Sequence, residues 1–201
     1  MARFFSGDDL VIATHNDGKL AEFRQMFGGR IKNMHSARSL NLPSPPETGT
    51  TFLENVTIKA VAAAKASGRI ALADDSGLCV TALGGAPGVY SADWAEKPDG
   101  SRDFNFAMQR LLGELEGKSD RSAAFVSFIM LAFPDGHTEW VEGRAEGMIA
   151  QQPRGAGGHG YDPLFIPQGF DKTYAELGEE MKNKISHRAL AFSKMMEKCF
   201  R

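Results

Sequence analysis

The chain has 201 residues, with 23 Lys and Arg against 25 Asp and Glu, and a formal net charge of -2. Hydrophobic residues make up 42% and charged residues 24%, which is ordinary for a globular chain and excludes a disordered chain, a coiled coil or a fibrous repeat. The charge balance disfavours a protein that binds nucleic acid, because such proteins carry a basic excess. Any anion that binds must therefore meet a local positive site.

The cysteines and the apolar runs bear on the compartment. Cys79 and Cys199 are too few for a disulfide framework or a zinc site. The first nine residues lack the apolar core of a signal peptide, and no apolar run approaches the roughly 18 residues of a membrane span. We therefore expect a cytoplasmic protein that binds neither a membrane nor nucleic acid.

The first third of the chain predicts the order strand, helix, helix, strand, with a polar loop after each strand. The short apolar run at 10–13 is typical of a buried strand, and apolar residues at helical spacing follow over 19–27. A capping box begins a second, alanine-rich helix over 51–68. A second apolar run at 70–73 predicts a strand that ends at the acidic segment 74–77.

The rest of the chain predicts two further helices and a long hairpin. Residues 103–117 have the apolar spacing of a helix, and 123–133 and 138–149 read as the two strands of the hairpin. Residues 153–170 form a glycine-rich loop, and a final helix covers 184–200. We expect one α/β domain of all 201 residues, built on a mixed sheet.

Residues 14–19, Thr-His-Asn-Asp-Gly-Lys, join the first strand to the first helix. Backbone N–H groups at a helix start, with the charge of Lys19 beside them, could cradle a triphosphate. The segment is not a Walker A loop, because Ala13 and Leu20 stand where that motif needs glycine and a hydroxyl residue. A capped turn with a surface lysine is an equally good interpretation.

Two adjacent carboxylates, Asp74 and Asp75, follow the second strand. Burial and mutual repulsion disfavour their charged forms, and Mg²⁺, which takes oxygen ligands, would relieve that cost. One of them could act as a general base toward water, and alternation along an extended segment would turn only one toward a given cleft. Glu47 could add a carboxylate, whereas Glu54 reads as the capping partner of Thr51. An ordinary acidic turn and an exposed loop glutamate are the competing interpretations.

Two further segments could meet a nucleotide. Ring side chains among the glycines of 157–163 offer a stacking surface for a flat base, although Tyr161 could equally be anchored in the core. Lys182 and Arg188 can meet phosphate or a carbonyl oxygen, and His187 can donate to a ring acceptor, although a solvated charge run explains them as well. Together, the four segments hold the parts needed for magnesium-assisted cleavage of a nucleoside triphosphate.

From about Leu10 to Phe192 the chain resembles the inosine triphosphate pyrophosphatase family, which acts on non-canonical purine nucleoside triphosphates. The blocks that carry the resemblance are THNDGK at 14–19, ETG at 47–49, TFLEN at 51–55, LADDSGL at 72–78, LGGAPGVYSA at 83–92, PRGAGGHGYDPLF at 153–165 and ISHRALA at 185–191. Their order along the chain makes chance agreement very improbable.

The resemblance implies an α/β fold in which an elongated central mixed sheet and flanking helices form two lobes around an active-site cleft. It implies Mg²⁺-dependent hydrolysis of ITP, dITP and XTP to the nucleoside monophosphate and pyrophosphate, which removes deaminated purines from the nucleotide pool. It also implies a homodimer.

Roles for individual residues follow from the same resemblance. Asp75 would be the general base and would bind Mg²⁺ together with Glu47. The residues expected to contact substrate are Thr14, His15, Asn16, Asp17, Gly18, Lys19, Ser76, His159, Gly160, Tyr161, Asp162, Lys182, His187 and Arg188. His15 and His159 depart from the glycine and the phenylalanine that many members have. The first change would narrow the phosphate loop, and the second would replace the stacking ring by an imidazole, which stacks less well.

In the implied mechanism, Lys19 and Mg²⁺ offset phosphate charge while Asp75 deprotonates water for attack on the α-phosphorus. A protein donor pairs with a 6-oxo group but meets another donor in the 6-amino group of adenine. The runner-up is a Maf-like pyrophosphatase that acts on other nucleotides, including pyrimidines. A nucleotide sensor without hydrolysis is disfavoured, because a pure binder needs no base beside a metal.

Overall fold

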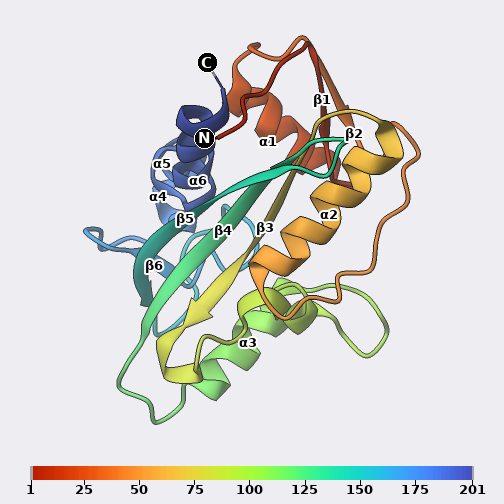
Figure 1. Cartoon of the computed structure of the whole chain (residues 1–201). Coiled ribbons are helices and arrows are strands. Elements are labelled where there is room, and N and C mark those ends of the chain that lie inside the picture. Colours follow the sequence, from red (N-terminus) through yellow and green to blue (C-terminus); the bar gives the residue numbers. More distant parts are fainter. Residues whose placement is uncertain (1, 201) are drawn as a thin grey trace. The chain divides into compact units, whose positions relative to one another are not determined.

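The computed structural model describes residues 2–200 and has an α/β fold (Figure 1). The helices and strands are β1 (Asp9–Ile12), α1 (Asp17–Phe27), β2 (Asn33–Ser36), α2 (Phe52–Ser67), β3 (Ala71–Val80), α3 (Phe104–Glu114), β4 (Ser122–Ala132), β5 (Thr138–Ile149), β6 (Phe165–Pro167), α4 (Tyr174–Leu177), α5 (Glu179–Ile185) and α6 (His187–Cys199). The sheet order is β2-β1-β3-β4-β5-β6. Strand β1 pairs in parallel with β2 and β3, whereas β5 and β6 are antiparallel, so the expected mixed sheet is confirmed.

The chain divides into two compact units. Unit 1 comprises Met1–Asp75, Phe128–Gly143 and Ala191–Arg201, and unit 2 comprises Ser76–Ser127 and Arg144–Leu190. The chain passes between them inside strands β3, β4 and β5 and inside helix α6 rather than through linkers. The active-site cleft implied by the resemblance stays a prediction.

In unit 1, helices cover both faces of the strands (Figure 1). Helices α1 and α6 bury Phe23, Phe27 and Met195 against one face, in a cluster that includes Leu72 of β3. Helix α2 buries its small side chains, such as Ala60, against the other face. Burial of apolar area at roughly 25 cal/mol per Å² is the main force that holds these layers together.

Local signals define α1 and α2 as expected. The side chain of Thr51 accepts a hydrogen bond from the Glu54 backbone N–H at 3.2 Å, and Glu54 accepts in return from the Thr51 N–H at 3.0 Å. The predicted capping box, worth about 1 kcal/mol, is therefore confirmed. Both helices end at left-handed glycines, Gly28 with φ 55° and Gly68 with φ 65°.

Two expectations about elements are wrong. The single helix expected over 184–200 is interrupted at Ser186, whose φ of -72° and ψ of 157° are extended. Its hydroxyl accepts a hydrogen bond from the Ala189 N–H at 3.2 Å, so Ser186 ends α5 and begins α6. Strand β2, Asn33–Ser36, was not expected, because four mostly polar residues show no apolar alternation and pair only along β1.

Unit 2 has its own core, to which loops and strands contribute aromatic side chains. Phe125 of β4 packs edge-on against Phe165, with ring centroids 4.8 Å apart, and Phe165 in turn contacts Tyr174 at 5.0 Å. Tyr161 and Leu111 of α3 belong to the same buried cluster. This core underlies the glycine-rich loop that the sequence singled out.

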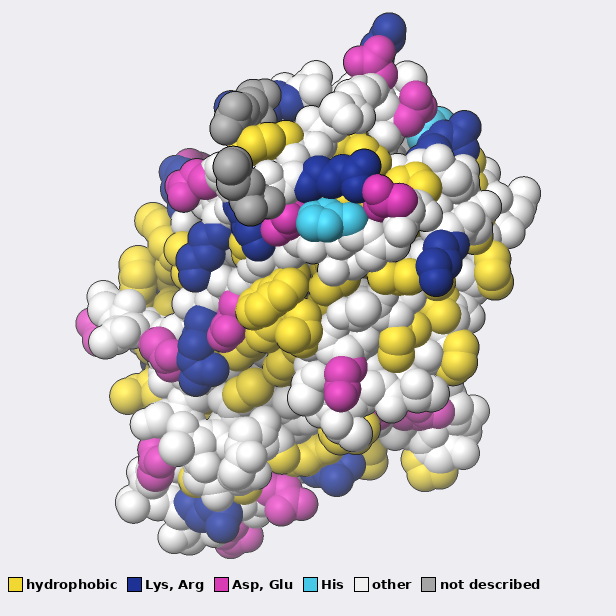
Figure 2. Space-filling view, viewed as in Figure 1, with side chains coloured by type: hydrophobic (Ala, Val, Ile, Leu, Met, Phe, Trp, Pro, Cys, Tyr) yellow, Lys and Arg dark blue, Asp and Glu magenta, His cyan; other side chains and the backbone are white. Residues whose placement is uncertain are grey.

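Surface charge and helix length bear on the expected partners. On the face shown in Figure 2, Lys and Arg side chains are interspersed with Asp and Glu rather than arranged as one positive stripe. Within residues 2–200, no helix combines the length and the apolar character needed to cross a bilayer. Neither observation conflicts with a small-molecule substrate.

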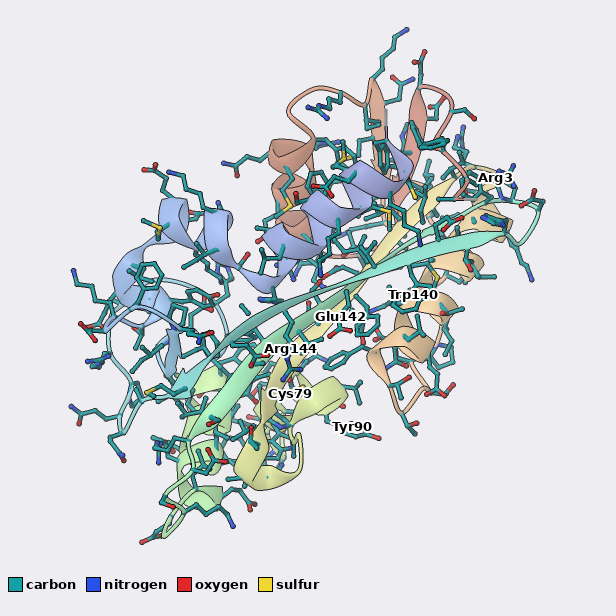
Figure 3. All side chains as sticks on the ribbon, turned by 60° about the vertical axis from the view of Figure 1, so that its left-hand side comes forward. Arg3, Cys79, Tyr90, Trp140, Glu142 and Arg144 are labelled. Carbon is teal, nitrogen blue, oxygen red and sulfur yellow. The ribbon has the colours of Figure 1, made fainter. Side chains whose placement is uncertain are left out.

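The N-terminal arm of unit 1 is tied to the end of the β4–β5 hairpin. The guanidinium of Arg3 pairs with Asp135 and lies 4.1 Å from the centre of the Phe133 ring (Figure 3). Its backbone N–H donates to Glu139 Oε1 at 2.9 Å. Farther along β5, Trp140 is 43% exposed and stacks on a neighbouring phenylalanine ring.

Candidate active site

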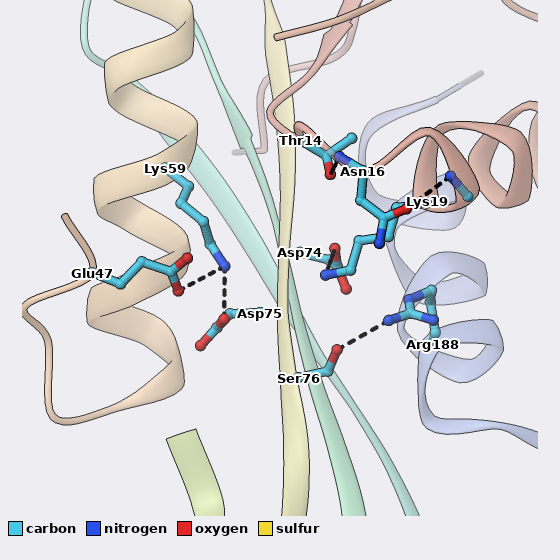
Figure 4. Close-up of polar contacts among 10 residues, drawn as sticks. Thr14, Asn16, Lys19, Glu47, Lys59, Asp74, Asp75, Ser76 and Arg188 are labelled. Atoms are coloured by element: carbon cyan, nitrogen blue, oxygen red, sulfur yellow. Dashed lines mark hydrogen bonds and ion pairs between the residues drawn. The ribbon is translucent and has the colours of Figure 1, made fainter. Parts of the chain in front are cut away.

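Strand β3 places both aspartates inside the sheet rather than in a turn. The expectation that the strand ends at residue 73 is wrong, because β3 runs from Ala71 to Val80 and buries Asp74 and Asp75 in its middle. The segment stays extended because β3 lies beside β4 in the sheet and lysines pair with both carboxylates. Since side chains alternate along a strand, the two carboxylates point in opposite directions (Figure 4).

Asp74 faces helix α1. Its Oδ1 accepts a hydrogen bond from Lys19 Nζ at 3.0 Å, and its side chain is 3% exposed against 33% for Lys19. The partner of Lys19 is therefore Asp74, the neighbour of the expected general base Asp75. The structure therefore holds the lysine at the start of α1 with its charge partly open to solvent.

The turn before α1 is ordered by its own side chains (Figure 4). The Asn16 side chain accepts hydrogen bonds from the Gly18 N–H at 2.8 Å and the Lys19 N–H at 3.4 Å. The Asn16 N–H donates to the Thr14 hydroxyl at 3.1 Å. Thr14, Asn16, Gly18 and Lys19 thus come together at the positive end of α1, as the phosphate-loop prediction requires.

Two residues of the same segment have partners outside it. The His15 ring donates from Nε2 to the Leu42 carbonyl oxygen at 2.9 Å, which ties the turn to the following loop. Asp17 pairs with the exposed Arg38 at 3.1 Å. Both side chains shape the turn, and neither joins the Thr14–Asn16–Lys19 group through a hydrogen bond recorded in the structure.

Asp75 faces the other way, toward α2 and the loop before it. Lys59 Nζ lies 2.7 Å from Asp75 Oδ1 and 3.2 Å from Glu47 Oε2, so one ammonium links the two carboxylates that we expected to share a metal (Figure 4). The side chains of Lys59 and Asp75 are only 13% and 12% exposed. Lys59 was not predicted from the sequence, although a lysine among the apolar residues midway along an alanine-rich helix was a usable signal.

The protonation of this pair follows from its burial. Burial raises the pKa of Asp75 to about 6, against the opposing effect of Lys59. For Lys59, burial alone would lower the pKa, but Asp75, Asp74 and Glu47 together raise it, so the ammonium stays charged. The second oxygen of Asp75, Oδ2, is buried and has no hydrogen-bond partner among the described residues. Asp75 is thus a carboxylate with a pKa suited to accepting a proton and one oxygen left to do so.

The residues around Asp75 fit the expected divalent cation in donor type. Glu47 and Asp75 supply oxygen ligands, which Mg²⁺ prefers, and the unpartnered Oδ2 can take one more interaction. Within residues 2–200, His, Cys, Asp and Glu side chains do not form a preassembled cluster of three. The remaining ligands would therefore come from water or phosphate oxygens.

In unit 2, a basic side chain at the start of α6 meets a serine of strand β3. Arg188 Nη2 donates to the Ser76 hydroxyl at 3.1 Å (Figure 4). His187 is 6% exposed, and its ring stacks on Phe125 with centroids 4.8 Å apart and planes 12° apart. Because the ring is packed into the core, His187 can offer at most an edge to a ligand.

The glycine-rich loop separates into exposed and buried members. The side chain of His159 is exposed and free to stack, whereas Tyr161 is 2% exposed and donates its hydroxyl to the Ser91 carbonyl at 3.0 Å. Gly160 lies over the ring of Phe104. The ring of Tyr161 therefore supports the loop from the core, and the expectation that residue 161 borders the base stays a prediction. Asp162 is also buried, at 1% exposure.

The chain is similar to known proteins over nearly its whole length. The model of the Ham1 family matches residues 10–198. A dITP/XTP pyrophosphatase of Mesorhizobium japonicum is 53% identical over 204 residues, covering 95% of this chain and 93% of that protein. A dITP/XTP pyrophosphatase of Ruegeria pomeroyi is 52% identical over 206 residues, covering 100% and 99%.

Solved structures give the same result. A HAM1 protein from Coxiella burnetii matches with a TM-score of 0.88 at 39% identity, covering 94% of this chain and 96% of that one. The Ham1 protein of Staphylococcus aureus matches with a TM-score of 0.84 at 38% identity, with the same coverage. Because both sequence and structure agree over nearly the whole length, the chain belongs to the Ham1 family.

Proposed function

We propose that this chain hydrolyses the non-canonical purine nucleoside triphosphates dITP, XTP and ITP to the monophosphate and pyrophosphate, and so removes deaminated purines from the nucleotide pool. Full-length relatives at about 50% identity that carry the name dITP/XTP pyrophosphatase support this activity. The single observation that carries the proposal is Asp75, a buried carboxylate with a pKa of about 6 and an unpartnered oxygen.

Asp75 acts as the general base in the proposed reaction. Its carboxylate takes a proton from water, the water oxygen bonds to the α-phosphorus, and the bond from the α-phosphorus to the bridging oxygen breaks so that pyrophosphate leaves. Lys59 holds Asp75 Oδ1 at 2.7 Å, and Oδ2, which has no hydrogen-bond partner among the described residues, is the oxygen that would take the proton. General-base catalysis of this kind contributes roughly 10²–10⁴-fold to a rate.

The phosphates are held by the start of α1. Lys19 supplies a full positive charge, and Thr14 and Asn16 order the turn that presents it. Glu47 and Asp75 are the residues that would hold Mg²⁺, and when bound the ion would offset charge on the phosphate oxygens. Lys59 would then remain as a second fixed cation beside them.

The purine is recognised by residues of unit 2. His159 offers an exposed ring for stacking, which is worth roughly 1–3 kcal/mol for an aromatic side chain. Lys182 and Arg188 carry only hydrogen-bond donors. Donors favour the oxo groups of hypoxanthine and xanthine and disfavour the 6-amino group of adenine, because the mismatch leaves polar groups unpaired.

A panel of triphosphates tests the proposal. Pyrophosphate release would be measured with Mg²⁺ for dITP, XTP and ITP, for the normal purine triphosphates, and for UTP and TTP. We expect the deaminated purines to be turned over at least about 100-fold more efficiently than ATP. Preferential turnover of UTP or TTP would support the Maf-like alternative, and nucleotide binding without turnover would indicate a sensor.

Two further properties are proposed, a homodimer from the resemblance and a cytoplasmic location from the cysteine content and the apolar runs. We expect a homodimer, which light scattering coupled to size-exclusion chromatography would detect, and a cytoplasmic location, which cell fractionation would test. A monomer at micromolar concentration would contradict the first expectation.

A further inference from the structure

Asp162 is a buried carboxylate beside the exposed part of the glycine-rich loop. Only 2% of its side chain is exposed, so it has no surface to offer a substrate. Its Oδ2 accepts a hydrogen bond from the His159 backbone N–H at 2.7 Å and is also paired with the Lys182 ammonium. One oxygen atom therefore links the loop to helix α5.

The loop is shaped around this carboxylate. Gly158 has a φ of +82°, and a Cβ at that position would collide with the Asp162 side chain. The Asp162 carbonyl in turn accepts from the Ala175 N–H at 3.3 Å, which fixes its backbone against α4. The conformation that exposes the His159 ring therefore depends on the place of Asp162.

Lys182 comes to the same carboxylate from α5. Its side chain is 18% exposed, and its ammonium lies 5.9 Å from the centre of the Tyr174 ring. A charged hydrogen bond to a buried carboxylate is about twice as strong as a neutral one and limits the positions of the ammonium. The pairing also offsets part of the lysine charge, while an ammonium group has three donors and so keeps some for a further acceptor such as an oxo group.

We propose that Asp162 is a positioning residue that orients Lys182 and the His159 loop for the purine without touching it. This inference rests on the proposed function, and it replaces the expectation that Asp162 contacts substrate. Because Asp162 acts through Lys182, removing either side chain should disturb the same interaction with the base, and the chemistry at Asp75 should change little.

The test compares Asp162→Asn, Lys182→Met and the double variant in steady-state turnover of dITP. We expect each single variant to raise KM about tenfold with kcat within about threefold, because a charged hydrogen bond is lost on the base side only. The double variant should also raise KM about tenfold, since the effects of residues that act as one unit do not add. A roughly hundredfold rise of KM in the double variant would mean that Asp162 and Lys182 act independently and would overturn the proposal.

Amide hydrogen exchange at His159 gives a readout that does not depend on turnover. We expect exchange at least about tenfold faster in Asp162→Asn, and wild-type exchange in Asp171→Asn, which removes an exposed carboxylate of the same unit. Unchanged exchange in Asp162→Asn would contradict the inference. If the wild-type enzyme hydrolysed no triphosphate, the proposed function would fail, yet the exchange result would still decide whether Asp162 orders the loop.

The Lys182→Met variant decides the case if Asp162→Asn does not fold, because Lys182 is partly exposed and methionine keeps much of its length. A folded Lys182→Met variant with a tenfold higher KM for dITP supports the proposal. An unchanged KM overturns it, because Asp162 would then hold a lysine with no part in base binding.

Discussion

Each compact unit contains a buried lysine–aspartate pair, and the two carboxylates differ in how many donors they have. In unit 1, Asp75 Oδ1 accepts a hydrogen bond from Lys59, and Oδ2 has no hydrogen-bond partner among the described residues. Asp162 in unit 2 receives both a lysine and a backbone N–H. The first pair leaves a carboxylate that can still accept a proton, and the second uses its carboxylate to hold a loop.

The difference shows that burial alone does not identify a catalytic carboxylate. Both aspartates are at least nine-tenths buried by residue, at 9% and 1% exposure. What distinguishes Asp75 is the shortage of donors together with the nearby negative charge of Asp74 and Glu47, which adds to burial in raising its pKa to about 6. A surplus of donors has the opposite effect elsewhere in unit 1, at Glu139.

The largest expected effect is that of Asp75→Asn. Loss of the general base should lower kcat for dITP about 10³-fold or more, with the fold retained because Lys59 keeps its contact with Glu47. Pyrophosphate release would measure kcat, and circular dichroism would show whether the fold is retained. Asp162→Asn is the matched comparison, because it should act on KM instead; near-normal kcat in Asp75→Asn would reject the assigned mechanism.

A smaller effect is expected from Lys59→Met, and it should appear in the pH profile. The wild-type kcat/KM should fall as pH drops through about 6 or below, where Asp75 becomes protonated. Lys59 lowers the pKa of Asp75, so its removal should raise that pKa. The fall of kcat/KM with decreasing pH should then begin at a higher pH. We also expect kcat to fall about 10- to 100-fold, because Asp75 loses its orienting donor.

The control for that variant is Lys65→Met, which removes an exposed lysine from the same helix. Lys65→Met should leave unchanged both kcat and the pH at which kcat/KM falls. If kcat/KM of Lys59→Met fell at the same pH as that of the wild type, Lys59 would not set the pKa of Asp75. The contrast between the two pairs would then lose its electrostatic basis.

The smallest effect, on stability alone, is expected from Glu139→Gln. Burial opposes the charge of Glu139, but hydrogen bonds from Lys198, the Arg3 N–H and His137 outweigh it and lower its pKa to about 2. Its charge therefore stabilises the fold above its ordinary pKa, and this stabilisation is lost as pH falls toward 2. We expect the variant to lose about 1–3 kcal/mol of unfolding free energy at pH 7.

Urea unfolding at pH 7 and at pH 3 would measure that difference. It should shrink at the lower pH, because at pH 3 the Glu139 carboxyl is mostly protonated in the unfolded wild-type chain while it stays charged in the folded one, which favours unfolding. Glu142→Gln, a less buried position on the same strand, is the control and should change the unfolding free energy little. An equal loss at both pH values would mean that shape rather than charge explains the effect.

Much of the fold was predictable because its signals are local. The capping box at Thr51, the glycine ends of α1 and α2, and the hairpin of β4 and β5 all depend on residues that are near one another in the chain. The length of β3 was not predictable, because Asp74 and Asp75 look like a turn until distant lysines pair with them.

The order of residues along the chain was enough to indicate the α/β class, the triphosphate chemistry and the candidate base. Capping, apolar spacing and linear motifs depend only on residues that are close together in the sequence. Tertiary structure alone decided that Lys19 pairs with Asp74, that Lys59 joins Asp75 to Glu47, and that Tyr161 and Asp162 face inward. Burial and the partners of a charged side chain depend on segments far apart in sequence, and only the packed chain brings those segments into contact.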